Sequence, residues 1–264
     1  MDHDGWDLRE SGPPGADHTV LLLAGALCTV AFFEDLMAEP KLTEASVHLV
    51  AATLPGFGNS QPPDDLSVES YASLAGRLAA DIGCEAVLGH SLGANVAIEM
   101  AAAGKFSGPL VLLSPSFSRK DESKFPRALD HLGRVLGHLP YAAMFKVIGP
   151  AMKSSLPANR RDELVAELKK NDPRFVRRQT RRYLEYLDRY GSLVPRLCDS
   201  GVTARVVFGE HDDVRLADEE RRELDECPRT TVITISGTGH FTMNQEPRRV
   251  AELILEVIPA VPGR

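Results

Sequence analysis

The chain has 264 residues, of which 43% are apolar, so it can bury the core of one large domain or of one domain with an insertion. Its 37 acidic and 30 basic residues give a formal charge of −7, which argues against a nucleic-acid surface. The longest apolar run, residues 20–33, is too short and too interrupted to span a membrane. It follows the acidic start Met1-Asp2-His3-Asp4, which is not typical of a signal peptide.

The four cysteines are scattered along the chain and form no CxxC pair: Cys28, Cys84, Cys198 and Cys227. We interpret them as buried thiols in a reducing compartment, and a disulfide framework is not expected. The sequence therefore predicts a cytoplasmic protein with no nucleic-acid or membrane partner. It leaves the oligomeric state open.

The first part of the chain alternates strands with helices. An edge strand is predicted at residues 6–10, and buried strands without polar alternation are predicted at 18–24, 47–52, 85–88 and 110–113. A short helix is expected at 32–37. Ser67 can cap a longer helix that ends at Gly83, and another helix is predicted from Leu92 to Ala103.

The pattern changes between residues 118 and 199, where no buried strand is found. Four helical stretches are predicted there, at residues 125–138, 141–152, 160–170 and 173–190. A segment of this length is too long for a simple connection between strands, so we predict an inserted helical cap. The predicted division is a core of residues 1–117 and 200–264 and a cap of residues 118–199.

The strand and helix pattern resumes after the cap, with strands at 204–209 and 231–235 and helices at 216–227 and 247–257. Alternation of this kind predicts an α/β fold with a mostly parallel central sheet and helices on both faces. Functional sites of such sheets lie at the carboxyl ends of the strands.

Gly89-His90-Ser91-Leu92-Gly93 stands between the strand at 85–88 and the following helix. A glycine two residues before and two residues after the serine lets the chain make a tight turn that exposes the hydroxyl. This is the Gly-x-Ser-x-Gly nucleophile elbow, which predicts that Ser91 is a nucleophile. The alternative is an ordinary serine before a helix.

A serine nucleophile needs a base, and the base needs a group that orients it. His240 directly follows the last predicted strand and is the best-placed histidine, although it could be a surface residue on a glycine-rich turn. Glu210, Asp212 and Asp213 follow the preceding strand and are the candidate acids. The same cluster could suggest a metal site, but no second group of ligands supports one.

These motifs, together with Leu54-Pro55-Gly56-Phe57-Gly58-Asn59-Ser60, resemble the α/β-hydrolase superfamily in its lidded serine-hydrolase branch, from residue 20 to about 257. The resemblance implies the order serine, acid, histidine, and it selects Asp212 as the acid. It also implies an oxyanion hole built from the backbone N–H groups of Ala26 and Leu92. The chain departs from the family at Ala24, where relatives usually have a histidine that props the loop, and at Thr53, where many have an aspartate.

The resemblance implies acyl transfer through an acyl-enzyme, with Ser91 as nucleophile, His240 as base and Asp212 as its partner, and with no metal and no organic cofactor. The predicted activity is a serine hydrolase for an ester, lactone or thioester of a small, largely apolar substrate, and it should rise with pH through a pKa of about 6–7. We expect most of the aromatic and methionine side chains of the cap to pack it onto the sheet and the others to line an apolar pocket. Paired arginines at 177–178 and 181–182 indicate a solvated face or, alternatively, a site for an anionic group.

Two other kinds of function remain open. The same triad could serve a carbon–carbon bond hydrolase, a perhydrolase or a cofactor-free lyase. The fold could also belong to a ligand-binding or signalling protein with little turnover, because a fold by itself does not determine function.

Overall fold

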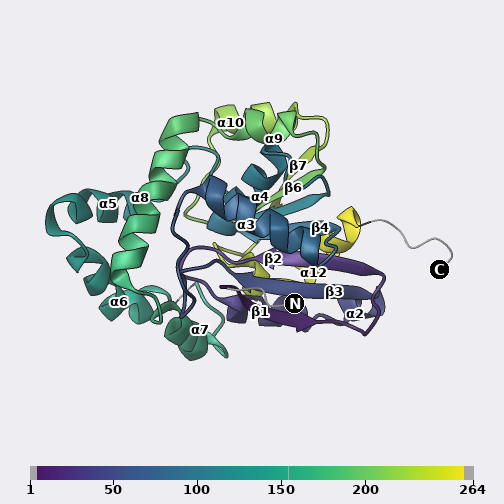
Figure 1. Ribbon diagram of the computed structural model, residues 1–264, viewed down its shortest axis with the longest axis horizontal. Helices are drawn as coiled ribbons and strands as arrows, with labels where there is room; N and C mark the ends of the chain where they lie inside the picture. Colours follow the sequence, from purple (N-terminus) through teal and green to yellow (C-terminus); the bar gives the residue numbers. More distant parts are fainter. Residues whose placement is uncertain (1–4, 154, 259–264) are drawn as a thin grey trace.

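The computed structural model describes residues 5–153 and 155–258, so the acidic start at Met1–Asp4 lies outside the described residues. Its centre is a seven-stranded sheet with the spatial order β1-β3-β2-β4-β5-β6-β7 (Figure 1). β1 is antiparallel to β3, and the other neighbouring strands are parallel. This confirms the predicted α/β fold. The strands are β1 (Asp7–Ser11), β2 (His18–Leu23), β3 (Val47–Thr53), β4 (Ala86–His90), β5 (Leu110–Leu113), β6 (Ala204–Gly209) and β7 (Thr230–Ile235).

Helices cover both faces of the sheet. Successive side chains of β2 enter two separate cores: Leu21 and Leu23 pack with α3 and α4, while Val20 and Leu22 pack with α1, α2 and α12. Burial on both faces explains why the strand is apolar without alternation. The helices outside residues 118–199 are η1 (Val30–Phe33), α1 (Glu34–Met37), α2 (Pro40–Glu44), α3 (Val68–Asp81), α4 (Leu92–Ala102), α10 (Asp218–Asp225), α11 (Thr242–Gln245) and α12 (Pro247–Val257).

Local sequence signals explain the ends of the longer helices. The Ser67 hydroxyl accepts a hydrogen bond from the Ser70 N–H at 3.1 Å, so Ser67 caps α3 as predicted. Gly83 follows that helix with a φ of +63°, which glycine adopts easily. The four- and five-residue helices α11 and α2 were not predicted, because elements this short contain too few residues to show a helical period.

The long segment between β5 and β6 is helical, as the absence of strand signals predicted. α5 (Lys124–Leu136), α6 (Leu139–Ala151), α7 (Arg161–Leu168) and α8 (Pro173–Tyr190) lie together at one end of the molecule, on the left in Figure 1. A fifth helix, α9 (Val194–Asp199), was not predicted and packs against α4. The boundaries 118 and 199 of a separate cap stay a prediction.

A buried carboxylate ties the inserted helices to the sheet layer. Glu99 of α4 is 3% exposed, and it accepts hydrogen bonds from Tyr186 of α8 at 2.9 Å and from Arg196 of α9 at 2.7 Å. A buried charge is stable only when it is paired and hydrogen-bonded, and both conditions are met here. Removing one partner would therefore loosen α8 or α9 from α4.

The cysteines differ from the sequence-based expectation. Cys198 of α9 and Cys227 after α10 form a disulfide, with their Cα atoms 5.7 Å apart, whereas Cys28 and Cys84 are free. The expectation of four thiols was wrong for this pair, because 29 positions separate two residues that only the packing of α9 against α10 brings together. The cytoplasmic location stays a prediction. Cys198 and Cys227 no longer support it, because they are not the reduced thiols on which it partly rested. No helix within residues 5–153 and 155–258 is long and apolar enough to cross a membrane.

Candidate active site

The turn between β4 and α4 has the geometry that its sequence predicted. Ser91 has φ 50° and ψ −118°, a left-handed backbone that is uncommon for a residue with a side chain. The Ser91 N–H donates to the Leu113 carbonyl of β5 at 2.8 Å, and its carbonyl accepts from the Ala94 N–H at 2.9 Å. The strained turn is therefore held by the neighbouring strand on one side and by the first turn of the helix on the other.

Both glycines of the elbow are required by close packing. A Cβ atom on Gly89 would overlap the backbone of Gly93 and Ala94, and a Cβ atom on Gly93 would overlap the carbonyl oxygen of Leu23. Backbone atoms cannot move aside as flexible side chains can. The motif therefore marks a place where the start of α4 crosses directly over β4 and the end of β2.

Asp212 and His240 meet at the edge of the sheet where β6 and β7 end. The His240 Nδ1 lies 2.9 Å from Asp212 Oδ1, and the carboxylate is 1% exposed while the imidazole is 27% exposed. Asp212 also accepts hydrogen bonds from the Ser114 hydroxyl at 2.5 Å and from the Val214 N–H at 2.9 Å. Because a carboxylate only accepts, Nδ1 carries the proton and Nε2 is free to act as a base.

The environment shifts the pKa values of both groups in opposite directions. Burial alone would raise the pKa of Asp212, but the hydrogen bonds from His240, Ser114 and the Val214 N–H hold it below its ordinary value. Burial alone would lower the pKa of His240, but the Asp212 carboxylate outweighs it, with further contributions from Glu122 and then Asp213, and the pKa is raised. The pair is therefore arranged to stabilise an imidazolium cation.

Ser91 belongs to the same edge of the sheet, but its contact with the histidine is not made. Within the described residues the Ser91 hydroxyl has no hydrogen-bond partner, and it is partly exposed. The side chain of His90 nevertheless connects the two sites, because its Nε2 donates to the His240 carbonyl at 3.0 Å and the two imidazole rings are 4.9 Å apart. Such catalytic hydrogen bonds are often long without substrate and shorten when substrate binds. Asp213, the alternative acid, is exposed.

The loop after β2 lies against the elbow. A Cβ atom on Gly25 would be 3.1 Å from the Ser91 Cβ and 2.8 Å from the His90 Nδ1, so the loop passes directly beside the serine. Ala26, the next residue, is exposed. Leu92 is the first residue of α4, where N–H groups have no partner inside the helix. The two predicted oxyanion donors are therefore on segments adjacent to Ser91.

His90 supports this loop from below, which the sequence did not predict. Burial, followed by the nearby charge on His240, lowers the pKa of His90 to about 3, so its ring is neutral. Its ring packs beneath Gly25 in a loop where Ala24 stands in place of the usual histidine. The other departure, Thr53, accepts a hydrogen bond from the Val30 N–H at 2.9 Å and donates one to Asp7 at 2.7 Å.

Asn171, between α7 and α8, is a second support that the sequence analysis missed. It is 4% exposed, donates to the Leu27 carbonyl at 2.8 Å and accepts from the Gly58 N–H at 2.9 Å. One side chain thereby joins the inserted helices to both loops beside the elbow. The same amide also donates to the nearby Leu168 carbonyl at 2.9 Å. No local signal in the sequence could reveal its role, because Leu27 and Gly58 are more than a hundred residues away.

A buried polar cluster lies one helical turn beyond Ser91. Tyr183 of α8 donates to Glu122 at 2.8 Å, Ser116 donates to the same oxygen at 2.6 Å, and Asn95 of α4 donates to the Ser116 carbonyl at 2.7 Å. Gln179, one turn before Tyr183, is 2% exposed, and its Nε2 has no partner in the described part of the chain. Buried amides are normally hydrogen-bonded, so this donor lacks the partner that burial usually requires.

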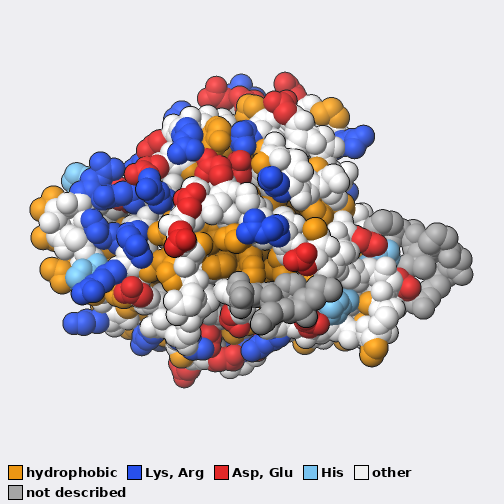
Figure 2. All heavy atoms as spheres, in the orientation of Figure 1, with side chains coloured by type: hydrophobic (Ala, Val, Ile, Leu, Met, Phe, Trp, Pro, Cys, Tyr) orange, Lys and Arg blue, Asp and Glu red, His pale blue; other side chains and the backbone are white. Residues whose placement is uncertain are grey.

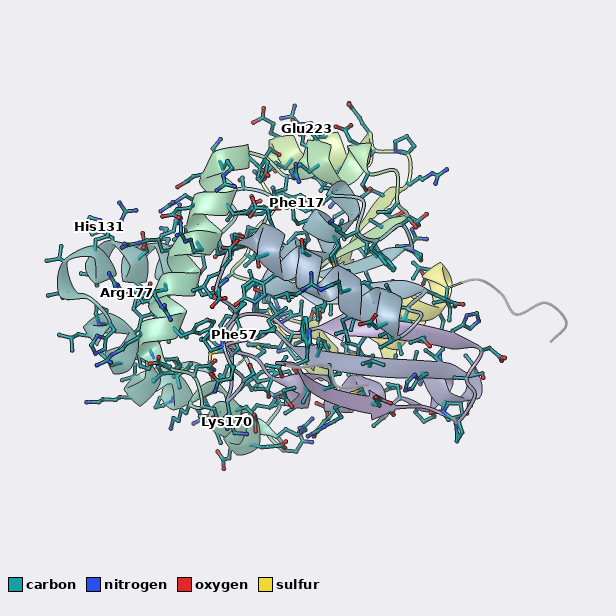
Figure 3. All side chains as sticks on the ribbon, viewed as in Figure 1. Phe57, Phe117, His131, Lys170, Arg177 and Glu223 are labelled. Carbon is teal, nitrogen blue, oxygen red and sulfur yellow. A yellow bond between two sulfur atoms is a disulfide. The ribbon has the colours of Figure 1, made fainter. Side chains whose placement is uncertain are left out.

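The buried face of α8 continues from this cluster to the loop at residues 54–60. Phe175 packs edge-on against Phe57 with ring centroids 5.1 Å apart, and a Cβ atom on Gly56 would overlap its ring. Phe57 is labelled beside α8 in Figure 3. The face of α8 directed at the sheet therefore carries Phe175, Gln179 and Tyr183 in successive turns.

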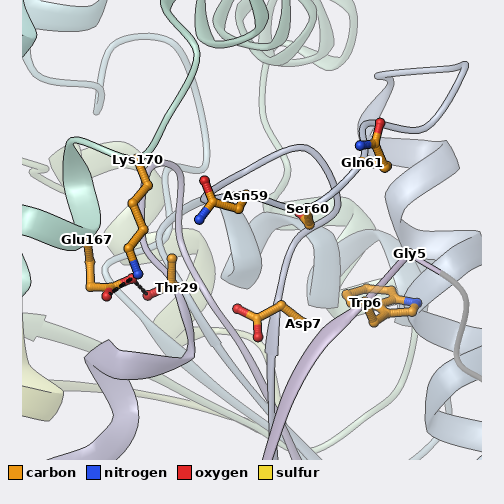
Figure 4. Close-up of a pocket in the computed structure, with 9 residues that line it drawn as sticks. All are labelled: Gly5, Trp6, Asp7, Thr29, Asn59, Ser60, Gln61, Glu167 and Lys170. Carbon is orange, nitrogen blue, oxygen red and sulfur yellow. Dashed lines mark hydrogen bonds and ion pairs between the residues drawn. The ribbon is translucent and has the colours of Figure 1, made fainter.

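A separate cavity of about 380 Å³ opens beside this region (Figure 4). Glu167 crosses one side of it, accepting from the Thr29 hydroxyl at 2.8 Å and from Lys170 at 2.5 Å. None of the candidate catalytic residues lines it, so it is not the candidate site; the lining residues are Gly5, Trp6, Asp7, Thr29, Asn59, Ser60, Gln61, Glu167 and Lys170. Within the described ranges no group of three or more His, Cys, Asp or Glu side chains is arranged to hold a metal ion.

The parallel sheet, the strained serine turn and the Asp212–His240 pair together define an α/β protein of the hydrolase type. A family model described as "Alpha/beta hydrolase family" matches residues 20–253, and the chain belongs to this family. No curated protein matches the chain in sequence.

Solved structures with the same fold cover nearly the whole chain at low sequence identity. An esterase from Exiguobacterium antarcticum is 15% identical with a TM-score of 0.75, over 95% of this chain and 94% of that one. A hydrolase from Oleispira antarctica, olei00960, is 16% identical with a TM-score of 0.74, over 94% and 93%. The N-acyl homoserine lactonase AidH is 19% identical with a TM-score of 0.69, over 96% and 93%. At these identities the likeness concerns the fold alone.

Proposed function

We propose that the protein is a serine hydrolase that cleaves an ester, lactone or thioester of a small, largely apolar substrate through an acyl-enzyme. The observation that carries the proposal is the 2.9 Å contact between His240 Nδ1 and the buried carboxylate of Asp212, beside a strained turn that exposes Ser91. The esterase and the lactonase named above have the same fold, and both names describe acyl chemistry.

In this mechanism His240 Nε2 takes the proton of the Ser91 hydroxyl while the oxygen attacks the substrate carbonyl. The N–H groups of Ala26 and Leu92 stabilise the oxyanion. The imidazolium then gives its proton to the leaving group, which departs, and the acyl group remains bound covalently to the Ser91 oxygen. Water, activated by the same imidazole, releases the acid and restores the hydroxyl.

Asp212 contributes orientation and charge in this mechanism. Its carboxylate keeps the proton on Nδ1 and raises the pKa of His240, which makes the imidazole a stronger base. Because the base must be neutral to act, kcat/KM should rise with pH through a pKa above the ordinary value of about 6.5 for histidine.

The substrate would bind between the elbow and the buried face of α8. Phe175 and Phe57 offer an apolar wall, and the unpartnered Gln179 Nε2 offers one donor to an oxygen of the substrate. Replacing Gln179 with Leu should raise KM more than it lowers kcat for substrates with such an oxygen, and it should change little for simple alkyl esters.

The test combines covalent labelling with turnover. A fluorophosphonate should label Ser91, as peptide mass spectrometry would show, and p-nitrophenyl esters of short acyl chains should be hydrolysed. Ser91→Ala should lose both properties, while Ser123→Ala, at a helix start where the hydroxyl makes no capping bond, should keep them. Labelling of Ser91 without turnover of any ester, lactone or thioester would instead favour a ligand-binding protein. Full activity of Ser91→Ala would refute the mechanism.

A further inference from the structure

The most exposed large apolar side chains of the described structure all lie on α5 and α6. They are between 48% and 83% exposed, and the four on α5, at positions 125, 132, 135 and 136, follow the spacing of one helix face. We call this set the α5–α6 apolar face: Phe125, Leu132, Val135, Leu136, Leu139 and Val147. Single exposed apolar residues are normal on a protein surface, but a periodic group on adjacent helices indicates a binding surface.

The exposed charged side chains of α5 and α6 are positive. Between residues 124 and 151 the only acidic residue is Asp130, whose side chain is 3% exposed and pairs with Arg134 and Arg181. On the adjacent helix α8, Arg178 is exposed, while Arg182 pairs with the exposed Glu185 at 3.0 Å. The basic residues of the segment are Lys124, Arg127, Arg134, Lys146.

The charge of the whole chain is divided in the same way. Residues 118–199 contain 18 basic and 10 acidic residues and have a net charge of +8. The other residues contain 12 basic and 27 acidic ones and have a net charge of −15. An asymmetry of this size orients the molecule in an electric field and directs the inserted helices toward a negative surface.

The position of the face decides which partner it fits. α5 and α6 form one extremity of the molecule in Figure 1, and in Figure 2 apolar and basic side chains alternate along its outline. In Figure 3 His131 projects from this end, while Arg177 lies where α8 meets α5 and donates to the Gly133 carbonyl at 3.1 Å. Apolar side chains on a projecting end suit insertion into a soft surface. A second copy of the chain would bring two positively charged ends together.

We propose that the α5–α6 apolar face binds peripherally to an anionic lipid surface. The apolar side chains would enter the boundary between headgroups and acyl chains, and the surrounding arginines and lysines would bind the headgroups. This proposal departs from the sequence-based expectation of no membrane partner, which rested on the absence of a spanning segment; peripheral binding does not require one. The proposal does not depend on the catalytic residues.

Flotation with unilamellar vesicles tests the proposal directly. The Ser91→Ala protein is used, so that lipid hydrolysis cannot affect the result. We expect it to float with phosphatidylglycerol–phosphatidylcholine vesicles and not with phosphatidylcholine alone, and to dissociate as salt increases.

Two variants separate the apolar and the electrostatic contributions. Val135→Ser with Leu136→Ser should weaken binding about tenfold for each side chain, and neither residue is needed for folding because both are exposed. Lys124→Gln with Lys146→Gln, exposed charges on α5 and α6, should weaken it about fivefold for each lysine. The control is Arg248→Gln, which removes a charge 71% exposed on α12, outside the α5–α6 apolar face, and should bind as the parent does.

Three results would overturn the proposal. They are absence of flotation with anionic vesicles, flotation that the serine variants do not weaken, and a dimer in solution that the serine variants dissociate. The last result would assign the face to a second copy of the chain. If the wild-type protein showed no hydrolase activity, the proposed function would be refuted, while the flotation result would still decide the lipid-binding proposal.

Discussion

The hydrogen bonds of Asp212 predict how much activity the Asp212→Asn variant should lose. Oδ1 accepts two N–H groups, from His240 and from the backbone of Val214, whereas Oδ2 accepts only the hydroxyl of Ser114. A backbone N–H can only donate, but a hydroxyl can reverse and accept. The asparagine should therefore keep its oxygen toward His240 and turn its amide toward Ser114, so that the imidazole keeps its tautomer.

The loss should then reflect the missing charge alone. A unit charge about 4 Å from the imidazolium contributes roughly 4 kcal/mol at the effective dielectric constant near a protein surface. The neutral hydrogen bond that remains recovers about 1 kcal/mol of this. We expect the activation free energy to rise by about 3 kcal/mol, so that kcat/KM falls roughly a hundredfold. A wrong tautomer of His240 would instead lower kcat/KM by about 10⁴-fold.

The assay is the pH dependence of kcat/KM for a p-nitrophenyl ester. The Asp212 carboxylate raises the pKa of His240, so the acidic limb of the profile should move to lower pH in Asp212→Asn. Asp213→Asn is the matched comparison, because Asp213 is exposed and its charge is the last of the causes that raise the His240 pKa. Its maximal activity should stay within about twofold of the parent, and its acidic limb should move less than that of Asp212→Asn. A loss near 10⁴-fold would refute the orientation argument. Loss of activity in Asp213→Asn but not in Asp212→Asn would refute the choice of acid.

The other predictions concern residues around the site. Glu122→Gln keeps an acceptor for the hydroxyls of Tyr183 and Ser116 but removes a charge that raises the pKa of His240, so the acidic limb of the pH profile should move to lower pH. The control is Glu185→Gln, which removes an exposed carboxylate on α8 and should leave the acidic limb unchanged. Asn171→Ala frees the loop after β2 and leaves the buried N–H of Gly58 unpaired, so kcat should fall by about tenfold to a hundredfold and the free energy of unfolding by about 1–3 kcal/mol. An unchanged kcat would show that the loop does not need this support. The control is Asn159→Ala, which changes an exposed side chain. Gly93→Ala forces a methyl group onto a backbone carbonyl, so thermal melting should show a loss of several kcal/mol or no folded protein, and a variant as stable as the parent would contradict the packing.

Prediction from sequence succeeded where the signal is local. The strands were recognised because burial on both faces requires continuous apolar runs, as in Val20 and Leu21, and the start of α3 was recognised because Ser67 caps it. The short helices α2, α9 and α11 escaped because a few residues cannot show a period. Phe125, expected among the residues that pack the cap or line its pocket, is instead 56% exposed, because it lies on the outer face of α5.

The sequence by itself determined the strained turn at Ser91, because only glycine at both flanking positions allows the backbone to pass so closely. It also determined which strand ends carry the acid and the histidine. Only the tertiary structure decided that Glu122 is close enough to act on His240, that Asn171 joins two loops, and that two distant cysteines pair. These contacts join residues far apart in the chain, and their energies depend on distances that exist only after the inserted helices pack on the sheet.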